Sequence, residues 1–189
     1  MPARTSTTRA SRPVTRRRRW RRLAGAVIVL VVIFAAVTGR LFVWPAQGMP
    51  ARVDAIVVLG GPGDRLGKGL ELAARDRAPV LAISEGLEVP PSLCRPRSQA
   101  PRVICFQPDP LTTQGEAEAA GRLARQYGWR SIVLVTTPDQ DTRARIRFGR
   151  CFDGGLYVVT TALPASQWLY QLAYQWAATA KALVLQRSC

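Results

Sequence analysis

The chain has 189 residues and a formal net charge of +15, and it contains no histidine. The missing histidine excludes a Ser-His-Asp triad, a Cys-His pair and any His-ligated metal site. The length suits one domain of about 100–150 residues plus an appendage. Nine of the 27 basic residues lie in residues 1–22, which hold no acid, so the remaining 18 basic and 12 acidic residues leave the rest of the chain with a net charge of +6.

The N-terminal part predicts a membrane anchor behind a basic tail. Residues 1–22 are rich in Arg, Ser, Thr and Pro, which is typical of a disordered segment. Residues 23–39 carry no charge, and a span over residues 23–44 is long enough to cross a bilayer if Arg40 snorkels to the far interface. Trp20 and Trp44 flank this span, where an interfacial aromatic belt would lie. The arginines favour a cytoplasmic N-terminus, so we expect a single-pass protein of the cell membrane whose C-terminal domain is extracytoplasmic.

Two other interpretations of this region remain open. A cleaved signal peptide also combines a basic start with an apolar stretch, but this stretch is long for one, and no clean A-x-A site follows it. An arginine-rich tail also suits nucleic-acid binding. The adjoining apolar span accounts better for the charges, so we expect the lipid bilayer as a partner and no nucleic acid.

The four cysteines all lie after the predicted span, at positions 94, 105, 151 and 189. An even number outside the cytoplasm favours disulfides, and three pairings are possible. We favour Cys94–Cys105, which closes a short loop, and Cys151–Cys189, which ties the C-terminal segment to the body of the domain. Without a C-x-x-C spacing or a histidine, the sequence predicts no metal site.

Short apolar runs alternate with helical patterns over residues 53–189, after a linker at residues 45–52. Continuous runs rich in β-branched residues are typical of strands that are buried on both faces of a parallel sheet. The predicted strands are residues 56–59, 79–84, 103–106, 131–136 and 156–160, and the predicted helices are residues 66–75, 113–127, 139–150 and 164–186. A Pro- and Arg-rich loop is expected at residues 87–101. The pattern predicts an α/β fold, a Rossmann-like three-layer sandwich with a mainly parallel five-stranded sheet, preceded by one N-terminal transmembrane helix.

A glycine-rich turn follows the first predicted strand. Gly60, Gly61 and Gly63 allow the backbone to turn sharply and to approach a ligand closely. Leu66 stands where the dinucleotide-binding fingerprint would need its third glycine, and Gly69 stands where a phosphate-binding P-loop would need Ser or Thr. The turn is therefore either a ligand-binding loop or a tight connection between strand and helix.

The carboxyl ends of the predicted strands define a candidate site, because open parallel sheets bind ligands at that edge. Arg65 directly follows the glycine turn and would reach an anion there. Glu116 and Glu85 are the carboxylates at this edge that could act as general bases. The candidate ligand-binding residues are Gly60, Gly61, Gly63, Arg65, Ser84, Thr113, Glu116, Thr136, Gln140 and Arg143.

Each of these polar residues also has a purely structural interpretation. Thr113 with Glu116, and Thr137 with Gln140, both fit the capping box that begins a helix. Pro138 suits the first helical position. Ser84 could satisfy the end of a strand, and Arg143 could be a solvated helix charge.

The same residues carry a resemblance to a known family. They read Val58-Leu59-Gly60-Gly61, then Arg65, then Ser84-Glu85-Gly86, then Thr113-Gln114-Gly115-Glu116-Ala117, then Val135-Thr136-Thr137 followed by Gln140, Arg143 and Ala144. This order resembles the YdcF-like family, which includes the SanA and ElyC envelope proteins and is classed as a domain of unknown function. The resemblance covers about residues 53–186 and implies a Rossmann-like fold, an anchored envelope location and a polar pocket. Gln140 occupies the position of the family histidine and Glu116 a position where Asn is common, so the resemblance leaves it open whether the chain is an enzyme.

Two functions are compatible with the sequence. The first is a membrane-anchored envelope protein whose polar pocket takes a small anionic or nucleotide-like ligand, such as a lipid-linked precursor in cell-envelope or peptidoglycan biogenesis. The second is a non-catalytic envelope interaction domain with a decayed pocket, whose net charge of +6 contacts anionic polymer. The sequence specifies no cofactor for either function.

Overall fold

A computed structural model describes residues 14–86, 89–95 and 101–189 of the chain. It divides the chain into two compact units, Met1–Val37 and Thr38–Cys189. The predicted loop at residues 87–101 is described only in part, because residues 87–88 and 96–100 lie outside the described residues.

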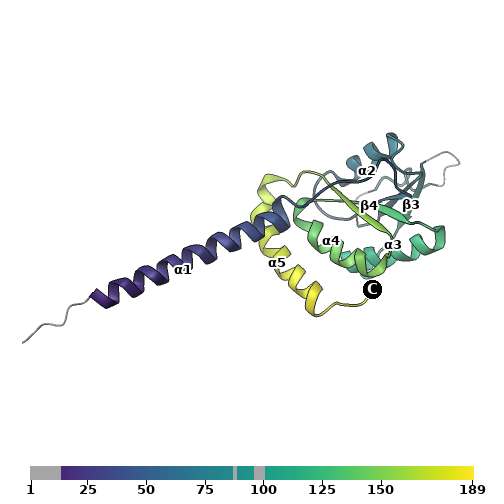
Figure 1. Cartoon of the computed structure of the whole chain (residues 1–189). Helices are drawn as coiled ribbons and strands as arrows, with labels where there is room; N and C mark the ends of the chain where they lie inside the picture. The colour runs from purple at the N-terminus through teal and green to yellow at the C-terminus, as the bar shows by residue number, and fades with distance from the viewer. Residues whose placement is uncertain (1–13, 87–88, 96–100) are drawn as a thin grey trace, which may run out of the picture. The chain divides into compact units, whose positions relative to one another are not determined.

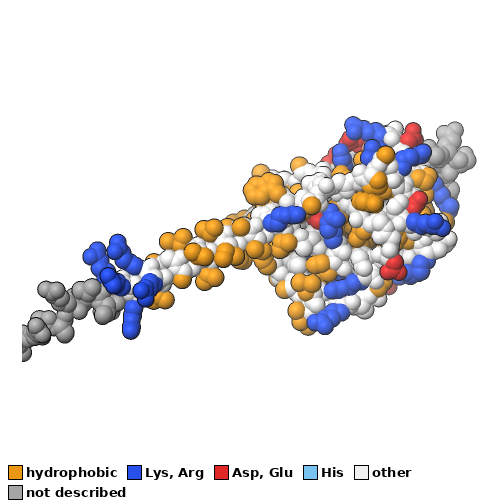
Figure 2. All heavy atoms as spheres, viewed as in Figure 1, with side chains coloured by type: hydrophobic (Ala, Val, Ile, Leu, Met, Phe, Trp, Pro, Cys, Tyr) orange, Lys and Arg blue, Asp and Glu red, His pale blue; other side chains and the backbone are white. Residues whose placement is uncertain are grey.

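The first unit is the greater part of a long helix, α1 (Val14–Thr38). The helical residues Arg17–Val43, which include most of α1 and the five residues after it, are a candidate membrane span by length and composition. The large apolar side chains of α1 are exposed, from Leu23 to Val37, and Figure 2 shows them along the helix with basic side chains at its N-terminal end. An apolar surface on all sides is typical of a helix that lies in lipid. The predicted disordered tail is thus helical from Val14 onward, while residues 1–13 lie outside the described residues.

The second unit contains a five-stranded sheet in which all strands are parallel, as the sequence predicted (Figure 1). The strand order is β3-β2-β1-β4-β5. The strands are β1 (Ala55–Val58), β2 (Val80–Ser84), β3 (Arg102–Phe106), β4 (Ser131–Thr136) and β5 (Gly155–Thr160). The chain reverses its direction of strand addition between β1 and β4, and ligands in open α/β sheets bind outside the carboxyl ends of strands at such a point.

Helices cover both faces of the sheet, which makes the three layers. Helix α2 (Arg65–Ala74) packs on the face formed by Ile56 and Val58, and α3 (Thr113–Tyr127) with α4 (Pro138–Cys151) packs on the face formed by Ala55 and Val57. The alternation along β1 follows from the two-residue period of a strand, and both faces are apolar because both are covered. After β5, a 3-10 turn, η2 (Ala165–Gln167), leads into α5 (Trp168–Val184), which packs against α4.

The residues that directly follow α1 are packed into the second compact unit. Helix α1 continues into η1 (Gly39–Val43), a π-helix, in which Phe42 is fully buried and makes an edge-on contact with Trp176, with ring centroids 5.3 Å apart. The Thr142 hydroxyl donates to the Leu41 carbonyl at 2.6 Å. Residues at the end of the predicted span (23–44) and in the predicted linker (45–52) are therefore part of the compact unit that begins at Thr38.

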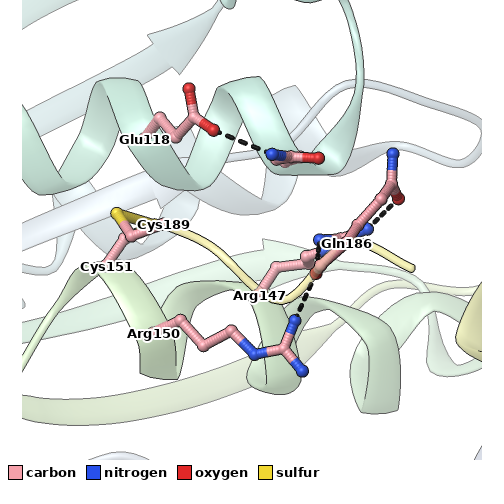
Figure 3. Close-up of a disulfide and its surroundings, with 7 residues drawn as sticks. Glu118, Arg147, Arg150, Cys151, Gln186 and Cys189 are labelled. Atoms are coloured by element: carbon pink, nitrogen blue, oxygen red, sulfur yellow. Dashed lines mark hydrogen bonds between the residues drawn. A yellow bond between two sulfur atoms is a disulfide. The ribbon is translucent and has the colours of Figure 1, made fainter. Parts of the chain in front are cut away.

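Two disulfides join the pairs that the sequence favoured. Cys94 pairs with Cys105 in β3, with Cα atoms 5.5 Å apart, and Cys151 at the end of α4 pairs with Cys189, with Cα atoms 4.9 Å apart. The first ties the described part of the 87–101 loop to an edge strand. The second holds the segment after α5 against α4 (Figure 3).

We predict that loss of the Cys151–Cys189 disulfide destabilises the full-length protein more than loss of Cys94–Cys105. The first closes a loop with a sequence separation of 38 and the second one of 11. Loop-closure entropy corresponds to about 4 and about 3 kcal/mol for such loops. Urea unfolding of Cys151→Ser/Cys189→Ser and Cys94→Ser/Cys105→Ser variants measures the difference. Thiol labelling of the native protein before reduction is the control, and labelling of all four cysteines would contradict the pairing.

Candidate functional site

A pocket of about 470 Å3 lies at the carboxyl edge of the sheet. The turns after β1 and β2, the starts of α3 and α4, and one side of α5 form its walls. The described residues that line it include Gly60, Gly61, Pro62, Gly86, Thr112, Thr113, Glu116, Gln140, Arg143, Arg147, Gln171, Tyr174, Gln175, Lys181 and Gln186. The pocket is therefore at the place where the topology predicts a ligand site.

The glycine turn after β1 is built around the side chain of Arg65. This side chain is fully buried; its Nε donates to the Pro62 carbonyl at 2.8 Å, Nη1 donates to the Gly60 carbonyl, and Nη2 donates to the Thr137 hydroxyl at 2.8 Å. Gly61 has a φ of +128°, and a Cβ there would lie 2.9 Å from the guanidinium nitrogens. The turn therefore requires glycine because the arginine fills the space beneath it.

Arg65 thus lies under the turn and does not line the pocket. Burial lowers the pKa of Arg65 to about 10, while the charges of Glu116 and Asp139 act in the opposite direction, so the guanidinium stays charged at neutral pH. The N-terminus of α2 is also occupied, because the Asp64 carboxylate accepts the Gly67 amide at 2.9 Å. An anion at this helix N-terminus would meet the Asp64 carboxylate, so the most direct interpretation of the glycine turn, a phosphate loop, does not fit the geometry.

Glu116 connects the start of α3 to the glycine turn. Thr112, rather than Thr113, caps α3 by accepting the Gly115 amide at 3.4 Å. Glu116 therefore does not take part in the predicted capping box; its Oε1 accepts the Gly60 amide at 2.6 Å, and Ser84 also hydrogen-bonds to the carboxyl group. The carboxyl group joins the ends of β1 and β2 to α3 at the floor of the pocket.

The environment of Glu116 favours its neutral form. Burial raises the pKa of the Glu116 carboxyl, against the hydrogen bonds from Gly60 and Ser84 and the charges of Arg65 and Arg143, which lower it. Burial dominates because an ionised carboxyl group loses most of its hydration there. A carboxyl group with a raised pKa can donate a proton or hydrogen bond to a bound ligand as well as accept one.

Gln140 and Thr113 meet across the pocket floor. The Gln140 side-chain amide donates to the Thr113 hydroxyl at 2.9 Å, and both side chains are buried. Thr137 is the N-cap residue of α4 with Pro138 in the first turn, but its hydroxyl accepts from Arg65 and makes no capping hydrogen bond. The second predicted capping box is therefore also absent, and both Gln140 and Thr113 are available at the site.

Basic side chains dominate the charged part of the pocket lining. Arg143, Arg147 and Lys181 are cationic, and Glu116 is the one acid among the described lining residues. Arg143 lies over the Tyr174 ring, with its guanidinium carbon 5.3 Å from the ring centroid, and donates to the Tyr174 hydroxyl at 3.3 Å. The lining therefore suits an anionic ligand with hydrogen-bonding groups.

The wall formed by α5 and the C-terminal segment was missed by the sequence analysis. Arg147 donates to the Gln186 carbonyl at 2.5 Å and to its side-chain oxygen, and Arg150 also donates to the Gln186 carbonyl (Figure 3). Arg150 donates to the Ala182 carbonyl at 2.9 Å as well. The nearby Cys151–Cys189 disulfide holds this segment in place. The spacing of Arg143, Arg147 and Arg150 on one face of α4 was the available signal, but it does not tell what that face contacts.

The predicted site residues fall into two groups. Those that line the pocket are Gly60, Gly61, Thr113, Glu116, Gln140 and Arg143. Ser84 and Thr136 are fully buried behind it, and the Thr136 hydroxyl has no hydrogen-bond partner among the described residues. Gly63 packs against the loop after β5, where a Cβ would lie 2.8 Å from the Ala162 carbonyl oxygen. Glu85 is exposed and is not part of the lining, which leaves Glu116 as the acid at the site.

Comparisons with known proteins do not assign the chain to a family. No protein-family model matches the chain, and searches of curated proteins and of solved structures find no similar protein. Within the described part of the chain, no group of three or more His, Cys, Asp or Glu side chains is placed to hold a metal ion.

We predict that Arg65→Ala lowers the free energy of unfolding of the domain and does not weaken ligand binding directly. The variant leaves the carbonyls of Gly60 and Pro62 without their donors and creates a cavity. The loss of a buried, hydrogen-bonded charge costs about 3–5 kcal/mol. Urea unfolding of the full-length protein measures the loss, with Arg75→Ala at the C-cap of the same helix as the exposed control, for which we expect about 0.5 kcal/mol or less. Equal effects of the two variants would rule out a structural role for Arg65.

A second prediction concerns the pH dependence that Glu116 contributes to stability. Because the pKa of Glu116 is raised in the folded state from its ordinary value of 4.5, the folded protein binds more protons than the unfolded chain above that pH. The contribution of Glu116 to the free energy of unfolding therefore falls as the pH rises from about 4.5 through the folded-state pKa, and then levels off. Glu116→Gln cannot titrate, so the variant should gain stability relative to the wild type over this pH range. Urea unfolding at a series of pH values tests this, and a stability difference that does not change with pH would contradict it.

Proposed function

We propose that the pocket binds a small anionic ligand of the size and polarity of a nucleotide or sugar phosphate. The observation that carries the proposal is the charge of the described lining residues, in which Arg143, Arg147 and Lys181 are basic and Glu116, whose pKa is raised, is the one acid. A cleft lined by one sign of charge attracts the opposite charge and concentrates it locally. The volume of about 470 Å3 falls within the range of small-molecule sites.

The lining offers separate contacts for the charged and the neutral parts of such a ligand. The guanidinium of Arg143 is held by Tyr174, so its planar donors are oriented before a ligand arrives. Lys181 on α5 adds a flexible point charge. Gln140 and Thr113 lie deeper and suit the hydroxyl or base groups of a ligand. Bidentate binding by Arg143 makes a phosphate or carboxylate the expected anion.

Binding is favoured over catalysis by the identity of the polar residues. Gln140 does not titrate, and its amide is held by Thr113. Glu116 is the one carboxyl group among the described lining residues, and its Oε1 already accepts the Gly60 amide. A reaction would therefore depend on Glu116 alone, whereas binding uses the lining as it stands.

We further propose that the chain is a YdcF-like envelope protein, anchored by α1 with its N-terminus in the cytoplasm. The residues that carry the resemblance support this, because Gly60, Thr113, Gln140 and Arg143 line one pocket although they are far apart in the sequence. The two disulfides support an oxidising, extracytoplasmic location for the domain. An anionic ligand in this location is compatible with a role in cell-envelope biogenesis, including that of peptidoglycan precursors. The alternative, an interaction domain without a ligand, would leave the cations of the lining without a counter-charge.

We predict that Arg143→Ala weakens binding of inorganic pyrophosphate and of ADP to the full-length protein in detergent micelles. The loss of one charge-assisted contact costs about 1.5–3 kcal/mol, which corresponds to a Kd raised about 10- to 100-fold. Isothermal titration calorimetry measures the change. Because the attraction is electrostatic, affinity should also fall as salt is added.

Arg122→Ala is the matched control for this experiment. Arg122 lies on α3, is exposed and does not line the pocket, but its replacement removes the same charge. We expect the affinity of this variant to equal that of the wild type. If neither probe binds the wild type, or if both variants weaken binding equally, the proposed pocket function is lost and the interaction-domain alternative is favoured.

A further inference from the structure

Helix α5 exposes an apolar surface along its whole length. Leu169 is 84% exposed, Tyr170 69% and Val184 62%. Three alanines lie between them on the same side, and all are exposed. Successive positions four or three residues apart share one side of a helix, and the resulting outer face of α5 consists of Leu169, Tyr170, Ala173, Ala177, Ala180 and Val184. Figure 2 shows hydrophobic side chains gathered over the part of the domain where α5 lies in Figure 1.

The amphipathic pattern of α5 is inverted relative to a helix on the surface of a soluble domain. Several of its polar side chains face inward, among them Gln175, which is 1% exposed and donates to the Asp139 carboxylate at 2.9 Å. Gln171 lines the pocket and Thr179 is buried. A helix between a protein core and water has the opposite arrangement, with its apolar side inward. The outer face of α5 is therefore suited to an apolar environment.

The composition around this face fits a bilayer interface. Residues 154–189 contain no Asp or Glu, so anionic lipid headgroups meet no like charge there. Lys181, which also lines the pocket, and Arg187 after the end of α5 are exposed, and both can pair with lipid phosphates. Tyr and Trp residues, such as Tyr170 and Trp44, are enriched at the boundary between headgroups and acyl chains. Trp44 is 75% exposed.

Helix α5 also contacts Thr38, which is the last residue of α1 and the first residue of the second unit. The Trp176 ring nitrogen donates to the Thr38 hydroxyl at 3.2 Å, and the Trp176 ring contacts Phe42. Thr38 is covalently joined to Val37, the last residue of the first unit, and the candidate membrane span Arg17–Val43 includes both residues. A helix fixed to Thr38 cannot be far from the membrane surface if α1 crosses the bilayer.

From these observations we infer that the outer face of α5 lies in the lipid interface of the membrane that holds α1. The helix would rest on the bilayer with its apolar side toward the acyl chains, in the manner of interfacial amphipathic helices. The pocket would then open beside the membrane surface, because its lining includes the opposite side of the same helix. This inference rests on the anchoring of α1 proposed above, but not on the identity of the ligand.

Photo-crosslinking of the full-length protein in vesicles of phosphatidylglycerol and phosphatidylethanolamine tests the inference. Benzoylphenylalanine is placed at Ala177 on the outer face of α5, and at Ala74 on α2 as the matched control. Both alanines are exposed on helices, but Ala74 adjoins the charged residues Arg75 and Glu71. We expect lipid adducts from position 177 and none above background from position 74. In a second variant, Leu169→Glu with Val184→Glu should abolish the adducts from position 177 without unfolding the domain, since both side chains are exposed.

A third label at Val31 separates failure of the anchor from failure of this inference. Adducts from position 31 without adducts from position 177 would leave α1 in the membrane and overturn the interfacial placement of α5. An adduct between two copies of the chain at position 177 would also overturn it, because the outer face would then be an interface between copies. Absence of lipid adducts at position 31 would overturn the anchor, and with it the premise for α5.

Discussion

The buried guanidinium of Arg65 is the interaction on which the rest of the site depends. It joins the glycine turn after β1 to Thr137 after β4, and these two strands flank the point where the sheet topology reverses. A charged group with little access to water is costly unless its donors are satisfied, and here two carbonyls and a hydroxyl accept from it. The turn that results presents the Gly60 amide to Glu116, which in turn fixes the start of α3. The pocket floor therefore follows from one arginine that does not itself reach a ligand.

The remaining wall of the pocket comes from the end of the described chain. Helix α5 faces the pocket with its polar side, and Arg147 and Arg150 on α4 hold the segment after it through Gln186 and Ala182. The helix also packs through Trp176 against Phe42, in the segment that follows α1. One helix thus takes part in the pocket and in the junction with the candidate membrane span. Its polar inner side and its apolar outer side both follow from the spacing of polar and apolar residues along the helix.

The fold could be predicted because each strand is a short, continuous apolar run, and such runs have few other structures to adopt. Ile56 and Val57 pack on opposite faces of the sheet, and both are fully buried. The position of the site followed from the parallel topology, which brings Gly60, Thr113 and Gln140 to one edge. The direction in which individual side chains point could not be predicted from the sequence. Nothing in the sequence distinguishes an arginine that points under a turn, as Arg65 does, from one that points at a ligand. Likewise, Gln171 and Gln175 interrupt the apolar sequence of α5, and the structure places both on the side of the helix that lines the pocket.

The disulfide between Cys151 and Cys189 has a practical consequence for production of this protein. The position of the segment after α5 depends on that bond, because Cys189 is joined to Cys151 at the end of α4. Material produced in a reducing host cytosol would therefore be less stable, and one wall of its pocket would not be held in place. Binding assays on such preparations would report the loss of a wall rather than the properties of the intact pocket. Production with export to an oxidising compartment avoids this.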